Sequence, residues 1–176
     1  MSRGDAELAL VQLRRRVDDH FAAAVTRTAE AFACHEGCAQ CCGVRFGVFT
    51  VEADRVATAL ARLAQDDPQL RARVRTQADD PDHDACALLV DGRCSVYDER
   101  PLICRSHGLP VQRVADDGER VLEVCPLNFT ASVPPPASVL VLEAVNAPLG
   151  VLARMWDGAG ERIELAALAR AEDLPR

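Results

Sequence analysis

Four cysteines crowd into nine residues near the start of the chain, and these side chains are the ones best suited to do chemistry. The run reads Cys34-His35-Glu36-Gly37-Cys38-Ala39-Gln40-Cys41-Cys42. Cysteine binds metals as its thiolate, and short gaps let one loop wrap an ion or a cluster with little loss of chain entropy. Four more cysteines follow at wider spacing: Cys86, Cys94, Cys104 and Cys125. The sequence predicts that all eight are metal ligands.

The cysteine count leaves the grouping and the metal open. Eight thiolates suit two four-sulfur sites, or one site with four spare cysteines. The adjacent pair Cys41-Cys42 could face two sites, or one thiol could ligate while the other packs or acts as a redox thiol. Zinc forms closed four-cysteine tetrahedra, and iron–sulfur clusters use the same ligands. The predicted cofactor is therefore Zn²⁺ or an iron–sulfur cluster.

The histidines are weaker ligand candidates. His107 follows Cys104 by three positions, and His35 lies within the cysteine run. His20 is expected on a long helix and His83 in an acidic loop, where both would be solvated.

Composition and charge narrow the class of protein. The chain has 176 residues, of which 49 % are hydrophobic, and a formal net charge of −7. Such a chain can bury a core without disulfides, and its acidic balance argues against a nucleic-acid partner. The first ten residues do not show a charged start followed by an apolar run, so the sequence does not predict a signal peptide. We therefore expect a cytoplasmic location, where thiols stay reduced and can bind metal.

The apolar stretch 137–155 is the one segment that could suggest a membrane span. Glu143, Asn146 and Pro148 interrupt it. We expect a core helix pair here, within a helical tail of about 137–170, and no membrane partner.

Hydrophobic periodicity predicts the elements before the tail. Apolar residues at three- and four-residue steps predict an amphipathic helix over 5–33 that leads directly to the cysteine run. A short strand over 44–49 comes next. Thr50 is the expected N-cap of a helix to about residue 64, and a second helical piece covers 69–76.

Two β-hairpins are expected between the helices. Asp91-Gly92 suits a two-residue turn between strands 87–90 and 93–97, with Cys86 before the hairpin and Cys94 in its second strand. Asp116-Asp117-Gly118 could join strands 111–114 and 121–124, and Cys125 would close that hairpin. The predicted fold is α+β and mainly helical, with an irregular cysteine-rich metal-binding core and one or two short hairpins packed against amphipathic helices. We expect a single domain over 1–176, with its motif core at about 30–130.

The segment Tyr97-Asp98-Glu99-Arg100-Pro101-Leu102-Ile103-Cys104-Arg105 surrounds one of the candidate ligands. Arg100 and Arg105 could offset thiolate charge or bond the backbone around the site, or they could pair with Asp98 or Glu99. Tyr97 is expected to pack beside the site. Pro101 is expected to start a helical turn that aims Cys104 inward.

The cysteine run, Cys86 and the stretch from Cys94 to Arg105 together resemble a bacterial cysteine-cluster family often called YkgJ-like. The resemblance covers about residues 30–130. It implies a zinc- or iron-chelating role for the eight cysteines. Similar domains occur in flagellin lysine methylases that use S-adenosylmethionine, so the resemblance also implies a possible cluster. It does not supply a reaction.

Three functions remain open from the sequence. The leading prediction is a metal-binding protein with a structural, metal-handling or redox role, and no catalytic pair elsewhere indicates an enzyme. The second is a cluster-dependent enzyme for methyl transfer or oxidoreduction. Cys34, Cys38 and Cys41 match the spacing of the radical S-adenosylmethionine loop, but so short a chain does not supply the large barrel of those enzymes. The third is a protein-interaction module stapled by zinc.

Overall fold

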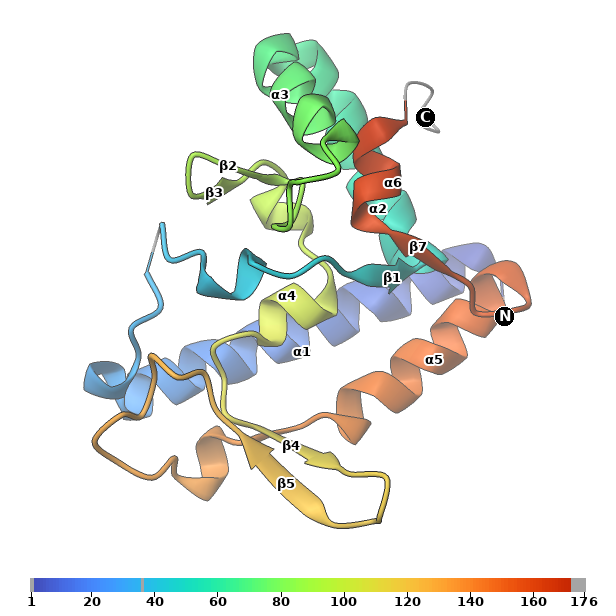
Figure 1. Cartoon of the computed structure of the whole chain (residues 1–176). Coiled ribbons are helices and arrows are strands. Elements are labelled where there is room, and N and C mark those ends of the chain that lie inside the picture. The colour runs from blue at the N-terminus through green and yellow to red at the C-terminus, as the bar shows by residue number, and fades with distance from the viewer. Residues whose placement is uncertain (1, 36, 172–176) are drawn as a thin grey trace.

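The fold, obtained as a computed structural model, is mainly helical α+β, as the sequence predicts (Figure 1). The structure describes residues 2–35 and 37–171. The helices are α1 (Arg3–Arg27), α2 (Thr50–Asp66), α3 (Pro68–Asp79), α4 (Leu102–Ser106), α5 (Glu143–Asp157) and α6 (Leu165–Arg170). The strands are β1 (Gly47–Phe49), β2 (Leu89–Val90), β3 (Arg93–Cys94), β4 (Val111–Val114), β5 (Arg120–Glu123), β6 (Leu140–Val141) and β7 (Arg162–Glu164). Short 3₁₀ turns are η1 (Ala29–Ala31), η2 (Gln40–Cys42), η3 (Tyr97–Glu99) and η4 (Pro136–Ser138).

Helix α1 ends six residues before the predicted limit of 33, at Arg27. Tertiary contacts explain the early end. The ring of Phe32 lies 5.1 Å from that of Phe129 and 5.7 Å from that of Phe21, measured between centroids. The backbone N–H of Phe129 also donates to the carbonyl of Ala31 at 2.8 Å. Because these partners are distant in sequence, local periodicity could not reveal them.

The expected N-cap of α2 is wrong by one residue. Phe49 is the N-cap, and Thr50 is the first helical residue. The Thr50 hydroxyl donates to the carboxylate of Asp157, and its backbone N–H donates to the carbonyl of Glu161 at 3.1 Å. Pairing of β1 with β7 holds Phe49 in an extended conformation, so the tertiary partner and not the Thr50 side chain sets the helix start.

Both predicted hairpins form. In the first, Leu89 pairs with Cys94 and Val90 with Arg93. Asp91 and Gly92 have φ values of 51° and 75°, the left-handed conformation that this turn requires. In the second hairpin, β4 pairs antiparallel with β5.

The tail differs from the predicted helix pair. A single helix, α5, runs through Pro148, and strand β6 precedes it and pairs in parallel with β4. Strand β7 follows and pairs with β1. Pro148 removes one backbone donor, but Val145, Leu149 and Leu152 of the same helix are buried, and that burial outweighs the lost bond.

Buried apolar side chains form two clusters. One joins α2, α3, β2 and α6, with Leu60, Val74 and Leu88 among its members. The other joins α1 to α5 and includes Leu10 and Leu149. Figure 1 shows the first cluster's helices in the upper part of the view, with α1 and α5 crossing below. No helix among the described residues is long and apolar enough to cross a membrane.

Glu52 ties α4 to α2. Its side chain is 5 % exposed, and it accepts a hydrogen bond of 2.7 Å from the backbone N–H of Leu102. Burial raises the pKa of this carboxyl. Its hydrogen bond satisfies a donor at the first turn of α4, the helix that carries Cys104.

Replacing Glu52 should therefore destabilise the fold. We expect Glu52→Ala to lower the free energy of unfolding by about 1–3 kcal/mol, since it leaves the Leu102 N–H buried and unpaired. Glu119→Ala, at an exposed glutamate, should change it by less than about 0.5 kcal/mol. Urea unfolding measures both, and equal stability of the two variants would contradict this role.

Candidate metal centre

The cysteine run forms a loop between the end of η1 and β1. Cys34 and Cys38 lie in coil, and Cys41 and Cys42 lie in η2. The loop is held by short-range backbone bonds, from the N–H of Cys38 to the carbonyl of His35 at 3.0 Å and from that of Cys42 to Ala39 at 2.9 Å. Figure 1 shows this loop with the β2–β3 hairpin above it and α4 below it.

Three of the dispersed cysteines approach the loop from other elements. The backbone N–H of Cys86 donates to the carbonyl of Cys42 at 2.8 Å, which fixes the start of the first hairpin against η2. Cys94 ends β3, opposite Leu89. Cys104 lies in α4. The fourth, Cys125, follows β5.

Electrostatic interactions between the thiols divide the cysteines into two groups. Cys42 interacts with Cys86, Cys94 and Cys104, and we call these four the inner group. Cys34 interacts with Cys38 and Cys125, and we call these three the outer group. Cys41 interacts with members of both. Cysteines that lie far apart in sequence are therefore near enough in space to influence one another's ionisation.

The inner group is the more buried of the two and resists ionisation. Burial, followed by the nearby thiols Cys86, Cys94 and Cys41, raises the pKa of Cys104 to about 12. Burial also raises the pKa of Cys86 and of Cys94. The pKa of Cys41 is raised because its thiol donates a hydrogen bond to Cys42, and the same bond lowers the pKa of Cys42. Cys41, Cys86, Cys94 and Cys104 therefore favour the protonated thiol until a cation stabilises their charge, whereas Cys42 ionises more readily.

The donor set fits a thiophilic metal. All eight cysteines are free thiols. In the part of the chain that the structure describes, no three Cys, His, Asp or Glu side chains converge closely enough to hold one ion. Ligation would therefore require each group to contract, and the coil and short turns that carry the cysteines can adjust more readily than long helices.

An arginine framework holds the segment around Cys104. The carbonyl of Asp98 accepts hydrogen bonds from Arg14, at 2.7 Å, and from Arg105. Arg105 also pairs with Asp18 at 2.6 Å and donates to the carbonyl of Arg100 at 2.8 Å. Of the roles expected for Arg105, backbone bonding is therefore observed, and the carboxylate that it pairs with is that of Asp18.

Glu99 extends this framework to two helices. Its carboxylate pairs with Arg14 of α1 at 2.7 Å and with Arg55 of α2 at 2.9 Å. Each ion pair lies at a junction between elements, so together they fix the Tyr97–Arg105 segment against both helices.

Arg100 faces the thiols. Its positive charge favours the thiolate forms of Cys41, Cys94 and Cys104. Its guanidinium lies 3.6 Å from the centroid of the Tyr97 ring, and the Tyr97 side chain is mostly exposed. Tyr97 thus supports Arg100 and does not pack as a buried neighbour of the cysteines.

Asn128 is a site residue that the sequence did not suggest. Its side chain donates to the Cys34 sulfur at 3.3 Å and to the carbonyl of Gly108 at 2.7 Å. Its amide oxygen accepts from the backbone N–H of Ala33 at 2.8 Å. The residue is 3 % exposed and joins three segments, so it fixes the position of Cys34. A lone asparagine carries no local signal of this role.

The histidines differ in environment. His20 is half-buried, with Nε2 3.2 Å from the carbonyl of Ser138, and Nε2 of His83 is buried without a hydrogen-bond partner among the described residues. Both side chains were expected to be solvated, and the structure shows both partly buried. His35 is exposed, and its Nδ1 lies 2.7 Å from the carbonyl of Ala33. Burial lowers the pKa of His107, and the nearby carbonyl of Ile103 partly opposes this shift.

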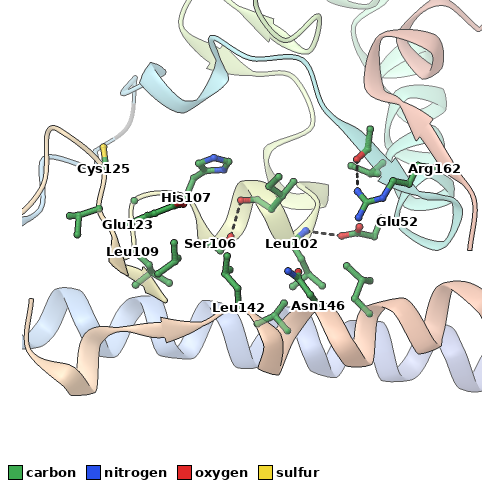
Figure 2. Close-up of a pocket in the computed structure, with 18 residues that line it drawn as sticks. Glu52, Leu102, Ser106, His107, Leu109, Glu123, Cys125, Leu142, Asn146 and Arg162 are labelled. Atoms are coloured by element: carbon green, nitrogen blue, oxygen red, sulfur yellow. Dashed lines mark hydrogen bonds between the residues drawn. The ribbon is translucent and has the colours of Figure 1, made fainter. Parts of the chain in front are cut away.

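A pocket of about 430 Å³ has Cys125 of the outer group in its lining. Figure 2 shows Cys125, Glu123 and His107 toward one end of it and Glu52 and Arg162 toward the other. Apolar side chains from α4, β4 and α5 line much of the wall.

A comparison with protein families finds a match to a described domain. The family model CxxCxxCC, described as a "putative zinc- or iron-chelating domain", matches residues 33–126, just over half of the chain. The matched range contains all eight cysteines. No curated protein and no solved structure matches.

Loss of the Asn128 side chain should weaken the outer group. We expect Asn128→Ala to lower stability by about 1–3 kcal/mol, because the Ala33 N–H and the Gly108 carbonyl lose their partner. Metal affinity should fall about 10–100-fold, as for other residues that orient ligands. Asn146→Ala, at an exposed asparagine, is the control. Unchanged metal affinity in Asn128→Ala would argue against a positioning role.

Metal-free protein should lose stability in alkali. An unfolded cysteine ionises near its ordinary pKa of 9.0, whereas Cys104 in the folded chain has a pKa of about 12. The contribution of Cys104 to stability is complete below the pKa of the unfolded cysteine. It is lost as the pH rises toward the folded pKa, because the unfolded state releases its proton first. From pH 8 to pH 10 we expect a loss of about 1 kcal/mol from Cys104 alone.

Urea unfolding of chelator-treated, reduced protein at the two pH values measures this loss. Cys104→Ser should show a smaller decrease than the unchanged chain. Equal decreases in the two proteins would show that Cys104 is not the titrating group.

Proposed function

This chain belongs to the CxxCxxCC family of zinc- or iron-chelating domains, and from that membership we propose that its eight cysteines hold metal as thiolates. The inner group of Cys42, Cys86, Cys94 and Cys104 would form one centre. The outer group of Cys34, Cys38 and Cys125 would form a second. Cys41 lies between them and could join either.

The placement of distant cysteines around one loop is the observation that carries this proposal. The Cys86 N–H donates to the Cys42 carbonyl at 2.8 Å, and the Cys42 thiol interacts with those of Cys86, Cys94 and Cys104. Four inner sulfurs match the number that zinc takes in a closed tetrahedral site, and iron–sulfur clusters also use four cysteines. A bound cation would remove the repulsion among neighbouring thiolates and replace it with attraction.

A structural role suits the inner centre. Its ligands would come from η2, the first hairpin and α4. The hairpin and Cys42 pack in one apolar cluster, whereas Leu102 of α4 belongs to the other. A metal would cross-link them, so its binding energy would add to the stability of the fold. Metal handling or redox chemistry would suit the more exposed outer centre. A reducing compartment such as the cytoplasm would keep the thiols available.

The pocket beside Cys125 favours one second candidate, a centre that acts on a small molecule. Pockets of several hundred Å³ with a few polar groups are typical of small-ligand sites. An iron–sulfur cluster at the outer group would make this enzyme reading the stronger of the two.

Metal analysis of protein purified anaerobically, under reduction and without chelators, tests the proposal. We expect either about two equivalents of zinc in a colourless sample or iron and sulfide in a brown one. Cys86→Ser and Cys125→Ser should each lose about one centre. Cys86→Ser should also lower the free energy of unfolding by roughly 3 kcal/mol or more, which corresponds to a fall in Tm of about 6–12 °C for a chain of this length.

Ala39→Ser, which adds a hydroxyl to the same loop without removing a thiol, is the matched control and should retain both centres. A chain that carries no metal under these conditions would refute the proposal. Full metal content in both cysteine variants would refute the ligand assignment.

A further inference from the structure

The outer group lacks one donor for a closed site. It contains three sulfurs, whereas structural zinc sites take four protein ligands. Cys41 is the one cysteine left over, and its thiol is hydrogen-bonded to Cys42 of the inner group. Here Cys41 is assigned to the inner side because of its hydrogen bond to Cys42, so that the fourth donor of the outer centre would come from another residue type.

We propose that Nδ1 of His107 is this fourth donor, so that the outer centre is formed by Cys34, Cys38, Cys125 and His107. The assignment rests on the proposed function, since it supposes that the outer cysteines bind metal. A three-cysteine, one-histidine set is a standard zinc environment.

The His107 ring has an unused polar atom. Its Nδ1 is buried, and within the described residues no partner lies at hydrogen-bond geometry, although the Ile103 carbonyl is close to the ring. A buried nitrogen without a partner is unfavourable, and a metal ion would satisfy it. The Phe46 ring, 5.5 Å away between centroids, packs against the imidazole and limits its orientation.

The backbone beside His107 lies against the Cys34 sulfur. A Cβ atom placed on Gly108 would lie only 2.6 Å from that sulfur, and the Gly108 φ of +96° also favours glycine. Asn128 bonds both the Cys34 sulfur and the Gly108 carbonyl. Cys34 is thus fastened to the segment that carries His107.

Cys125 follows β5, and His107 follows α4 just before the paired strand β4. Both side chains line the same pocket, and no other cysteine lines it. Figure 2 shows the Cys125 thiol and the His107 imidazole at the same end of that pocket. The only inner cysteine close to His107 in sequence is Cys104, three residues earlier, and it lies outside the pocket lining.

Cadmium-113 NMR of reduced, cadmium-loaded protein tests the assignment, because the chemical shift moves upfield when nitrogen replaces sulfur in the coordination shell. The unchanged chain should give two resonances, one from a four-sulfur site and one upfield of it. His107→Phe keeps the ring that packs on Phe46 but has no donor. It should remove or shift the upfield resonance alone and weaken one of the two sites by at least about tenfold.

His107→Cys should move the upfield resonance to the four-sulfur position. His83→Phe is the matched control, since His83 also has a buried nitrogen without a partner. It should leave both resonances in place, as should His35→Ala. Retention of the four-sulfur resonance in every variant reports that the fold is intact.

Two results of the NMR experiment would overturn the assignment. One is an unchanged upfield resonance in both His107 variants, with loss of that resonance in Cys125→Ser. The other is a shift of the resonance that Cys86→Ser abolishes, which would assign His107 to the inner centre. If the unchanged chain bound no cadmium at all, the proposed function would fail and this inference with it.

Discussion

The burial of several thiols close to one another is the constraint on which the rest of this structure depends. Burial, followed by the nearby thiols, holds the pKa of Cys86, Cys94 and Cys104 above its ordinary value, so these three thiols favour the neutral form without a cation. A divalent metal reverses the balance, because it attracts each thiolate more strongly than the thiolates repel one another. The chain belongs to a family of zinc- or iron-chelating domains, and this reversal is the physical basis we propose for that chelation.

The helices act as a frame for segments that have little structure of their own. Glu52 anchors the start of α4, and the arginine framework around Asp98 and Glu99 fixes the motif segment to α1 and α2. Asn128 does the same for Cys34. These contacts bring the cysteines near one another, and a bound metal would supply the final contraction. Stability and metal binding should therefore be coupled.

Sequence reasoning succeeded where structure is local and failed where partners are distant. The Asp91-Gly92 turn follows from the φ angles that its residues tolerate, so both the hairpin and the place of Cys94 in it were predictable. The end of α1 depends on the contact between Phe32 and Phe129, which no local pattern encodes. The residue Asn128 escaped notice for the same reason. Pro148 led us to expect that the helix would be interrupted, but α5 continues through it because its buried side chains stabilise the helix.

Sulfur K-edge and metal-edge X-ray absorption of the anaerobically purified, metal-containing protein tests the central claim most directly, since it identifies the atoms bound to the metal. We predict a first shell made mostly of sulfur, with metal–sulfur distances of about 2.3 Å, and a small nitrogen contribution. A first shell of oxygen and nitrogen without sulfur would contradict the account, because the thiols would then not be the ligands.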